Sequence, residues 1–529
     1  MDRLLDRLSR TPRLLAPLLG AAAACAFQPL GLWPLALLAL ALLIELIARA
    51  PSARRAALIG WLFGLGHFSL GNNWIATAFT YQAKMPPWLG WVAVLGLAAF
   101  LAIYPALAAL GAWLIGRRNY GALVLATAGS WIVSEWLRSW VFTGFAWNPL
   151  AAIAVGSIDH AGLAGLAPWL GTYALSGLVV ILAGAWLVAA KRGLPDWRGA
   201  ALVLGPVLLF LSPLRTVSLT EPDSRSLVVT LVQPGIDQTV LNDPAMFETN
   251  FGKLAALSAP REPGRRRLLL WPESGVPDYL REGYPERYYL DNYGADPVLA
   301  RRRLGTVAGA GGMLLSGTTD LEIGTVDGRE RAVGARNSVT ALDQTGAIRG
   351  SYAKAHLVPG GEYLPLRALL TPLGLARLVP GDIDFWPGPG PRTIDLGPWG
   401  RAGVQVCYEI IFSGQVVDRA NRPQFLFNPS NDGWFGAWGP PQHLAQARLR
   451  AIEEGLPVLR ATTTGISAVI DARGRVLDSL PQQQAGRIDL TLPDPLPPTL
   501  FARLGNLLGL GWAAVLLVLS AVASRHRRG

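Results

Sequence analysis

Eight long apolar runs constrain this chain more than any other feature of its sequence. Seven of them precede residue 215 and one lies near the C-terminal end, and most approach the ~20 residues with which an α-helix spans a bilayer. Hydrophobic residues make up 51% of the chain and charged residues only 16%, a composition typical of membrane proteins. We therefore predict a membrane domain of α-helices with eight transmembrane helices in all, at residues 14–27, 32–48, 57–79, 88–115, 121–141, 169–190, 199–214 and 504–523.

Basic residues are concentrated in alternate loops between these runs. Because cytoplasmic loops carry an excess of Lys and Arg, this pattern predicts a cytoplasmic N-terminus. Seven crossings then place the region after residue 214 on the outer side, and the eighth returns the C-terminus to the cytoplasm. The residues concerned are Arg3, Arg7, Arg10, Arg13, Arg49, Arg54, Arg55, Arg117, Arg118, Lys191, Arg192, Arg198, Arg525, Arg527 and Arg528, with Lys84 and Arg138 as the exceptions.

The formal net charge of +11 does not indicate nucleic-acid binding, because most of the excess lies in these short loops. The five histidines are scattered without ligand spacing, so no metal centre is expected. No glycine-rich phosphate loop follows a predicted strand, so the sequence indicates no nucleotide cofactor.

Two charged residues, Glu135 and Arg138, fall within the fifth apolar run and share one face of the predicted helix. Ionisable groups at membrane depth are costly and are often functional. A structural ion pair at the outer end of the helix explains them equally well, and both interpretations stay open.

The composition changes near residue 217, which predicts three domains: 1–218 as the transmembrane helical domain, 219–497 as an outer α/β domain and 498–529 as a final transmembrane helix with a basic tail. Short apolar runs alternate with helical stretches at 246–257 and 443–454, the pattern of a buried sheet covered by helices. The predicted strands are 227–232, 267–271, 312–316, 338–342, 403–406, 425–428, 458–461 and 468–470.

Three strand-like segments each end at a polar side chain, namely Glu273, Lys354 and Cys407. If the three ends met at one sheet edge, their chemistry would suit acyl transfer. Glu273 would act as general base, Cys407 as the nucleophile that forms a thioester, and Lys354 as a donor to the oxyanion, with the backbone N–H of Tyr408 as a second donor. Taken singly, the three are equally a turn carboxylate, a solvated lysine and a small buried cysteine.

Several motifs around these residues resemble those of the nitrilase superfamily. They are WPE at residues 271–273, LVPGGEY at 357–363 after Lys354, VCYE at 406–409 and NPSNDGWFG at 428–436. In this chain a nitrilase-like domain follows seven apolar runs and precedes an eighth. This organisation resembles that of the apolipoprotein N-acyltransferase family. The resemblance covers nearly the whole chain.

This resemblance implies an αββα sandwich on a helical membrane domain, with no cofactor. The implied reaction transfers an acyl chain from a phospholipid donor to the α-amino group of the N-terminal diacylglyceryl-cysteine of a lipoprotein. Its catalytic residues would be Glu273, Lys354 and Cys407, with a thioester on Cys407. The implied location is the bacterial inner membrane, with the catalytic domain in the periplasm and both termini in the cytoplasm.

The resemblance also implies a set of supporting residues around the triad. Glu362 would orient Lys354 or the amine acceptor, and Glu409 would hold the geometry of the site. The remaining supporting positions are Tyr408, Asn431 and Trp434.

Two further segments favour a lipid substrate. Residues 364–378 and 385–391 form a long apolar region after Lys354, and tyrosines cluster in residues 279–293. Long loops are often lids, and tyrosine suits a membrane interface, so we expect both segments to border the outer leaflet and admit an acyl chain. A covered hydrophobic core is the alternative.

Two other functions fit parts of the sequence. A membrane-anchored amidase of the nitrilase type would use water as its acceptor, and the triad alone does not exclude it. A transporter or receptor would use the outer domain only to bind a ligand. A membrane-anchored amidase would need only one transmembrane anchor. The seven apolar runs before the outer domain therefore favour the lipid substrate.

Overall fold

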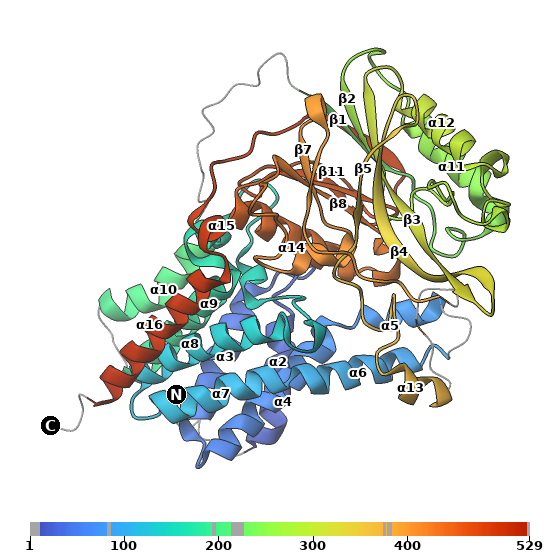
Figure 1. The fold of residues 1–529 in the computed structure, drawn as a ribbon. Helices are drawn as coiled ribbons and strands as arrows, with labels where there is room; N and C mark the ends of the chain where they lie inside the picture. The colour runs from blue at the N-terminus through green and yellow to red at the C-terminus, as the bar shows by residue number, and fades with distance from the viewer. Residues whose placement is uncertain are drawn as a thin grey trace.

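The computed structural model describes residues 11–81, 86–192, 197–212, 227–373, 377 and 383–525. A helical part occupies one end of the molecule and a part built on two β-sheets occupies the other (Figure 1). Several residues named above lie outside the described residues: Arg3, Arg7, Arg10, Lys84, Arg527 and Arg528, residues 213–226 at the predicted domain boundary, and residues 374–376 and 378–382 of the apolar segment.

Helices form where the apolar runs predict them, because Leu and Ala, which dominate the runs, favour helices. Two N-caps mark helix starts: Ser52 accepts a hydrogen bond from the N–H of Arg55, and Asn119 accepts one from Ala122. The helices are α2 (Pro12–Ala24), α3 (Trp33–Arg49), α4 (Ala53–Gly71), α5 (Ile75–Ala78), α6 (Leu89–Leu101), α7 (Ile103–Gly116), α8 (Tyr120–Arg138), α9 (Ala167–Arg192), α10 (Trp197–Leu211) and α16 (Asn506–Arg525).

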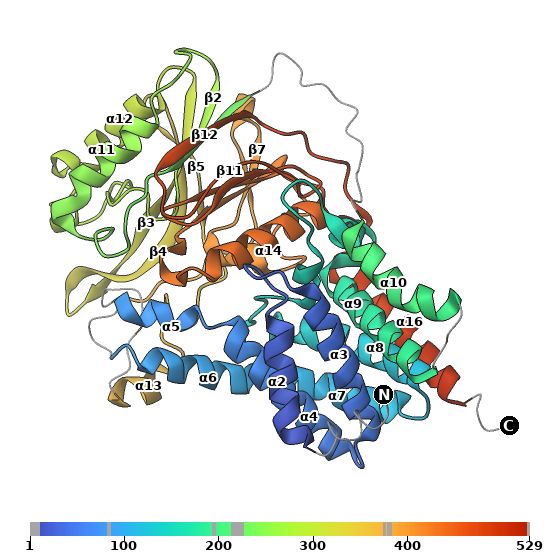
Figure 2. The same cartoon turned by 180° about the vertical axis from the view of Figure 1, so that it is seen from behind.

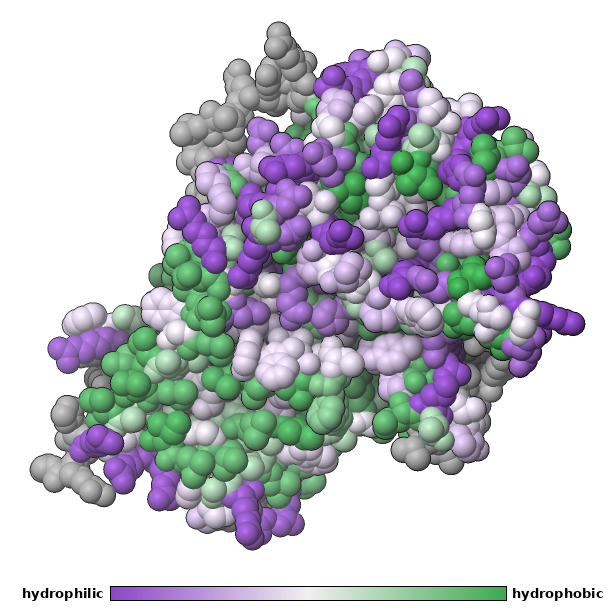
Figure 3. Space-filling model, viewed as in Figure 1, coloured by the Kyte–Doolittle hydropathy of each residue, from purple (hydrophilic) through white to green (hydrophobic). Residues whose placement is uncertain are grey.

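Three helical stretches in the described part of the chain are long and apolar enough to cross a membrane: Leu89–Gly116, Gly162–Lys191 and Asn506–Arg525. Two shorter apolar helices are Pro12–Ala24 and Trp197–Leu211. Hydrophobic residues cover the surface of the helical end, whereas the end with the sheets is mostly hydrophilic (Figure 3). Such a large exposed apolar surface indicates a membrane protein.

Helices α2 and α4 approach each other closely because glycines lie between them. A Cβ atom on Gly20 would lie 1.9 Å from the carbonyl oxygen of Phe63, and one on Gly66 would lie 1.9 Å from that of Pro17. Small residues at such crossings let helix backbones pack tightly, which is a common device in membrane domains.

The other part contains two six-stranded sheets, with strand orders β12-β1-β2-β3-β4-β5 and β11-β10-β9-β8-β7-β6. Within them β1, β2 and β3 run parallel, as do β7, β8 and β9. The first sheet contains β1 (Val228–Gln233), β2 (Arg267–Leu270), β3 (Gly312–Val326), β4 (Arg329–Asp343), β5 (Ile348–Ala353) and β12 (Gly486–Thr491). The second contains β6 (Thr393–Asp395), β7 (Arg401–Val404), β8 (Phe425–Ser430), β9 (Val458–Thr462), β10 (Ser467–Ile470) and β11 (Val476–Leu480).

The two sheets face each other across one hydrophobic core, to which Leu268, Val339, Val404 and Phe427 contribute. Helices α11 (Phe247–Leu257) and α12 (Pro297–Ala308) cover the outer face of the first sheet, and their core includes Trp271. Helix α14 (Gly439–Glu454) lies between the second sheet and the membrane helices (Figures 1 and 2). This arrangement is the αββα sandwich that the resemblance implied.

Helix α14 joins the two parts through buried polar contacts. The guanidinium of Arg448 donates to the carbonyl oxygens of Gly156, Ser157 and His160 at 2.6–2.9 Å. The indole N–H of Trp147 donates to Gln442 at 2.8 Å. These side chains fix the sandwich on the helical part.

Glu135 and Arg138 hold the connection that follows α8 and do not bind each other. Arg138 donates to the carbonyl oxygens of Phe145 and Trp147 at 2.9 and 2.7 Å, and Glu135 accepts from the N–H of Leu150 at 2.8 Å. No ion pair joins the two charges in the residues that the structure covers. Both therefore shape the segment that contacts the sandwich, and the ion pair between them, one of the two interpretations of the sequence, is not formed.

Candidate active site

The ends of strands β2, β5 and β7 bring Glu273, Lys354 and Cys407 together. The ammonium of Lys354 lies 3.6 Å from a carboxylate oxygen of Glu273. Both charged groups are close enough to shift the pKa of the Cys407 thiol, in opposite directions. The structure thus joins residues that are far apart in the sequence. Glu273 precedes Lys354 by 81 residues, and Lys354 precedes Cys407 by 53.

Cys407 occupies a sharp turn after β7. Its φ of +51° lies in the left-handed region, which is costly for a residue with a Cβ and is often found at functional sites. The side-chain amide of Asn428 holds the turn by donating to the carbonyl oxygens of Gln405 and Cys407, at 2.6 and 3.3 Å. The turn directs the chain into the short 3₁₀ helix η10 (Cys407–Ile411).

The surroundings of Cys407 favour its protonated thiol over the thiolate. Burial raises its pKa well above the usual range, Glu273 adds to this effect, and Lys354 opposes it. A thiol with a raised pKa needs a base in order to react as a nucleophile, and Glu273 is the neighbouring carboxylate.

Lys354 is a buried cation with only 1% of its side chain exposed. Burial lowers the pKa of Lys354, but the carboxylates of Glu362 and Glu273 outweigh it and the net pKa is raised. Its ammonium lies 3.0 Å from Glu362, so it stays charged and remains a hydrogen-bond donor.

Glu273 is held in place by two donors. The backbone N–H of Asn431 donates to one carboxylate oxygen at 2.8 Å, and the side-chain amide of Asn337 donates to the other at 2.7 Å. Asn337 also donates to Glu362 at 2.8 Å, so it bridges the two carboxylates beside Lys354. Sequence analysis missed Asn337, because a polar residue within β4 carries no local signal of this role.

Glu409 ties the turn at Cys407 to the segment after Lys354. One carboxylate oxygen accepts from the hydroxyl of Tyr352 at 2.7 Å and from the N–H groups of Ala355 and His356, and the other accepts from the N–H of Val406 at 2.7 Å. Burial raises the pKa of Glu409 to about 7, although these hydrogen bonds favour its ionised form. The predicted supporting position thus clamps two loops of the site.

The remaining predicted residues have different surroundings. Tyr408 packs beside the helical part, where its hydroxyl donates to the carbonyl oxygen of Gly144 at 3.4 Å. The side chain of Asn431 binds Gln238 at 2.8 Å. The ring of Trp434 packs edge-on against Tyr81, with centroids 5.7 Å apart, and does not join the triad.

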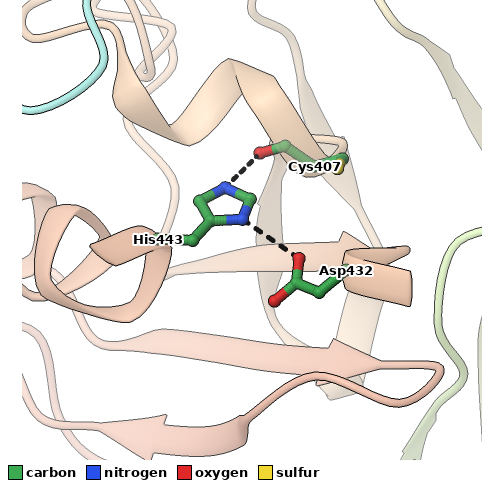
Figure 4. A group of neighbouring side chains, drawn as sticks. All are labelled: Cys407, Asp432 and His443. Carbon is green, nitrogen blue, oxygen red and sulfur yellow. Dashed lines mark hydrogen bonds and ion pairs between the residues drawn. The ribbon is translucent and has the colours of Figure 1, made fainter. Parts of the chain in front are cut away.

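A second cluster contains Cys407, Asp432 and His443, which have candidate metal-ligand atoms within 4.8 Å of one another (Figure 4). The cluster does not fit a metal ion, because both ring nitrogens of His443 already lie 3.1 Å from hydrogen-bonding oxygens. The guanidinium of Arg460 also binds Asp432, which places a cation where a metal ion would be repelled.

Known proteins are similar to this chain along most of its length. The family profile described as "Apolipoprotein N-acyltransferase N-terminal domain" matches residues 19–185, and "Carbon-nitrogen hydrolase" matches residues 228–493. An apolipoprotein N-acyltransferase of Allorhizobium ampelinum is 35% identical over 88% of this chain and 87% of its own. One from Rhodopseudomonas palustris is 33% identical over 97% of this chain and 95% of its own. Among solved structures, an amidase from Nesterenkonia sp. is 20% identical over 53% of this chain and 95% of its own, with a TM-score of 0.34.

Proposed function

The chain belongs to the apolipoprotein N-acyltransferase family, and from this premise we propose that Cys407, Glu273 and Lys354 carry out its acyl transfer. It is an acyltransferase whose sandwich is a carbon–nitrogen hydrolase domain. The observation that carries the proposal is the buried ammonium of Lys354 between two carboxylates, beside a cysteine in a left-handed turn.

In the first half-reaction the thiol of Cys407 transfers its proton to Glu273, and the sulfur attacks the ester carbonyl carbon of a phospholipid. The ammonium of Lys354 and the backbone N–H of Tyr408 stabilise the oxyanion. The intermediate collapses to a thioester on Cys407, and the leaving lysophospholipid alkoxide takes the proton from Glu273.

In the second half-reaction the α-amino group of a diacylglyceryl-cysteine attacks the thioester carbonyl carbon. Glu273 takes the proton of the amine and returns it to the thiolate of Cys407 as the C–S bond breaks. The products are an amide on the lipoprotein and the regenerated thiol.

The position of the site supports a lipid donor. The connection between α8 and α9 contacts the turn of the nucleophile, where the ring of Phe145 lies 6.4 Å from that of Tyr408. The backbone of Thr143 lies close enough to His356, two residues after Lys354, to affect the pKa of its imidazole. The reacting groups thus lie next to the helical part, where an acyl chain is available.

The apolar segment after Lys354 is proposed as a lid. Its two ends meet at the site: the N–H of Phe385 donates to the carbonyl oxygen of Glu362 at 3.1 Å, and that of Gly388 donates to the carbonyl oxygen of Lys354 at 2.7 Å. Deletion of residues 366–375 should abolish acyl transfer and leave the domain folded. Retained transfer would contradict this role.

The tyrosine segment at residues 279–293 has its own anchors on the first sheet. The hydroxyls of Tyr284 and Tyr288 accept from the N–H groups of Leu321 and Ala332 in β3 and β4. Its contact with lipid stays a prediction.

The proposed location is the bacterial inner membrane, with eight spans, a periplasmic sandwich and cytoplasmic termini. Contacts between helix ends support this topology. Lys191 lies 2.7 Å from Glu45, which also binds Arg49, and the side chain of Asn119 donates to the carbonyl oxygen of Ala523 at 3.0 Å. The ends of α3, α9 and α16 and the start of α8 therefore gather their basic residues on one side.

The proposed division of the chain follows from the same topology. Residues 1–218 form the helical domain, residues 219–497 the catalytic domain, and residues 498–529 the final helix and tail. The two matched family regions, 19–185 and 228–493, fall within the first two.

The decisive experiment is the intact-protein mass after incubation of the purified protein with phospholipid and no acceptor. We expect a mass increase of one acyl chain that is absent in Cys407→Ala, retained in the control Cys25→Ser, and released by a diacylglyceryl-cysteine peptide. Cys25 is the other cysteine and lies at the end of α2.

The alternative functions predict different results. Free fatty acid without amide product would indicate a hydrolase that uses water as its acceptor. The absence of both an adduct and turnover would refute the proposed chemistry and favour a binding protein.

A further inference from the structure

Three fully buried side chains behind the nucleophile have no part in the mechanism above. His443 lies on α14, Asp432 in the short 3₁₀ helix η11 (Asp432–Phe435), and Arg460 on β9. At most 2% of each is exposed. Figure 4 shows the imidazole of His443 between the carbonyl oxygen of Cys407 and the carboxylate of Asp432.

The hydrogen-bond partner of Nε2 places a proton on that nitrogen of His443. Its Nε2 lies 3.1 Å from the carbonyl oxygen of Cys407, which can only accept, so Nε2 carries a proton. Its Nδ1 lies 3.0 Å from Nη2 of Arg460, which can only donate, and 3.1 Å from a carboxylate oxygen of Asp432, which can only accept. Burial and the neighbouring charge of Arg460 lower the pKa of His443 against the opposing effect of Asp432, which agrees with a neutral ring that accepts at Nδ1.

The peptide bond between Cys407 and Tyr408 links this cluster to the reacting groups. Its carbonyl oxygen accepts from His443 and from Asn428. Its N–H, which belongs to Tyr408, has no hydrogen-bond partner within the part of the chain that the structure describes. Donors on an amide oxygen polarise the peptide and strengthen its N–H as a donor.

We propose that His443 is a positioning residue that holds and polarises the Cys407–Tyr408 peptide, so that the N–H of Tyr408 stabilises the oxyanion. Arg460 and Asp432 contact Nδ1 and hold the ring in the position from which Nε2 donates. This inference rests on the proposed acyl transfer and adds a residue that acts through the backbone and does not touch the substrate.

The test separates oxyanion stabilisation from the reactivity of the thiol. Alkylation of Cys407 by iodoacetamide is a displacement that forms no oxyanion, whereas formation of the acyl-enzyme does. In His443→Leu, which fills similar space without a donor, we expect acyl-enzyme formation to slow ~10- to 100-fold, less than the loss of a whole oxyanion donor. Alkylation of the same variant should stay within about threefold of wild type, because the thiol is unchanged.

Two polar variants keep the test decisive if His443→Leu fails to fold. The amide nitrogen of the glutamine in His443→Gln reaches the position of Nε2, whereas that of the shorter asparagine in His443→Asn does not. We expect His443→Gln to form acyl-enzyme faster than His443→Asn, with equal alkylation.

Three outcomes would overturn the inference: acyl-enzyme formation as fast as in wild type, a parallel loss of alkylation, or equal rates for the glutamine and asparagine variants. A wild-type protein that forms no acyl-enzyme would instead refute the proposed function.

Discussion

Replacement of Lys354 by methionine tests the electrostatics of the site most directly. The ammonium lies 3.0 Å from Glu362 and 3.6 Å from Glu273, and all three side chains are buried. At an effective dielectric constant of about 20, each contact is worth roughly 5 kcal/mol before the desolvation cost is subtracted. Removal of one partner from such a buried group typically costs about 3–5 kcal/mol, because it leaves uncompensated charge.

The expected effects of Lys354→Met concern both stability and rate. With a shift of about 2–4 °C per kcal/mol for a domain of this size, the melting temperature should fall by roughly 6–20 °C. Acyl-enzyme formation should slow ~100- to 1,000-fold through the loss of an oxyanion donor. Thermal unfolding in detergent and time-resolved intact mass measure the two, and Lys253→Met on the exposed face of α11 is the matched control.

A compensating variant separates the two effects. Lys354→Met combined with Glu362→Gln removes one negative charge along with the positive one, so it should regain most of the lost stability without regaining acyl transfer. The reasoning fails if Lys354→Met acylates within tenfold of wild type, or if the double variant is no more stable than the single one.

Three further predictions follow from contacts within the site. Asn337→Leu removes the amide that donates to the carboxylates of Glu273 and Glu362 beside Lys354. Acyl-enzyme formation, measured by intact mass, should therefore slow more than tenfold, and an unchanged rate would contradict the bridging role of Asn337. Tyr352→Phe removes one of the donors to Glu409 and should destabilise the protein by about 1.5–3 kcal/mol, seen as a lower melting temperature, whereas an unshifted transition would argue against the clamp. The pKa of Cys407 is raised, so its thiolate fraction should still be growing as the pH rises beyond 9. Alkylation of Cys407 should therefore be slow at pH 7 and keep increasing above pH 9, and a plateau near neutral pH would refute this expectation.

The strands that sequence analysis predicted are those whose side chains are buried. Strands β1, β2, β8 and β9 coincide with apolar runs, because a strand that is covered on both faces needs hydrophobic residues at successive positions. Strands β11 and β12 escaped prediction because most of their side chains are exposed or half-buried. Such edge strands are held by pairing with a neighbour, which leaves no apolar pattern in the sequence.

The triad could be proposed from motifs, but its surroundings could not. Glu273, Lys354 and Cys407 occur in short recognisable segments, and the structure brings them together. Asn337 and Arg460 lie within strands, where a polar side chain has no periodicity that would reveal its partner. Their roles depend on which strands are neighbours, a property of the whole sheet.

By itself, the sequence determined which segments are apolar enough to become membrane helices or buried strands. The free energy of burying a segment depends on its own apolar residues and on their spacing along the chain, and both can be read from the sequence. Its motifs also led to the proposal of Glu273, Lys354 and Cys407 as the reactive groups. Only the tertiary structure decided that the ammonium of Lys354 lies between two carboxylates and that His443 reaches the carbonyl oxygen of Cys407. Hydrogen bonds and ion pairs act over about 3 Å, so they are set by the register and packing of segments far apart in the chain.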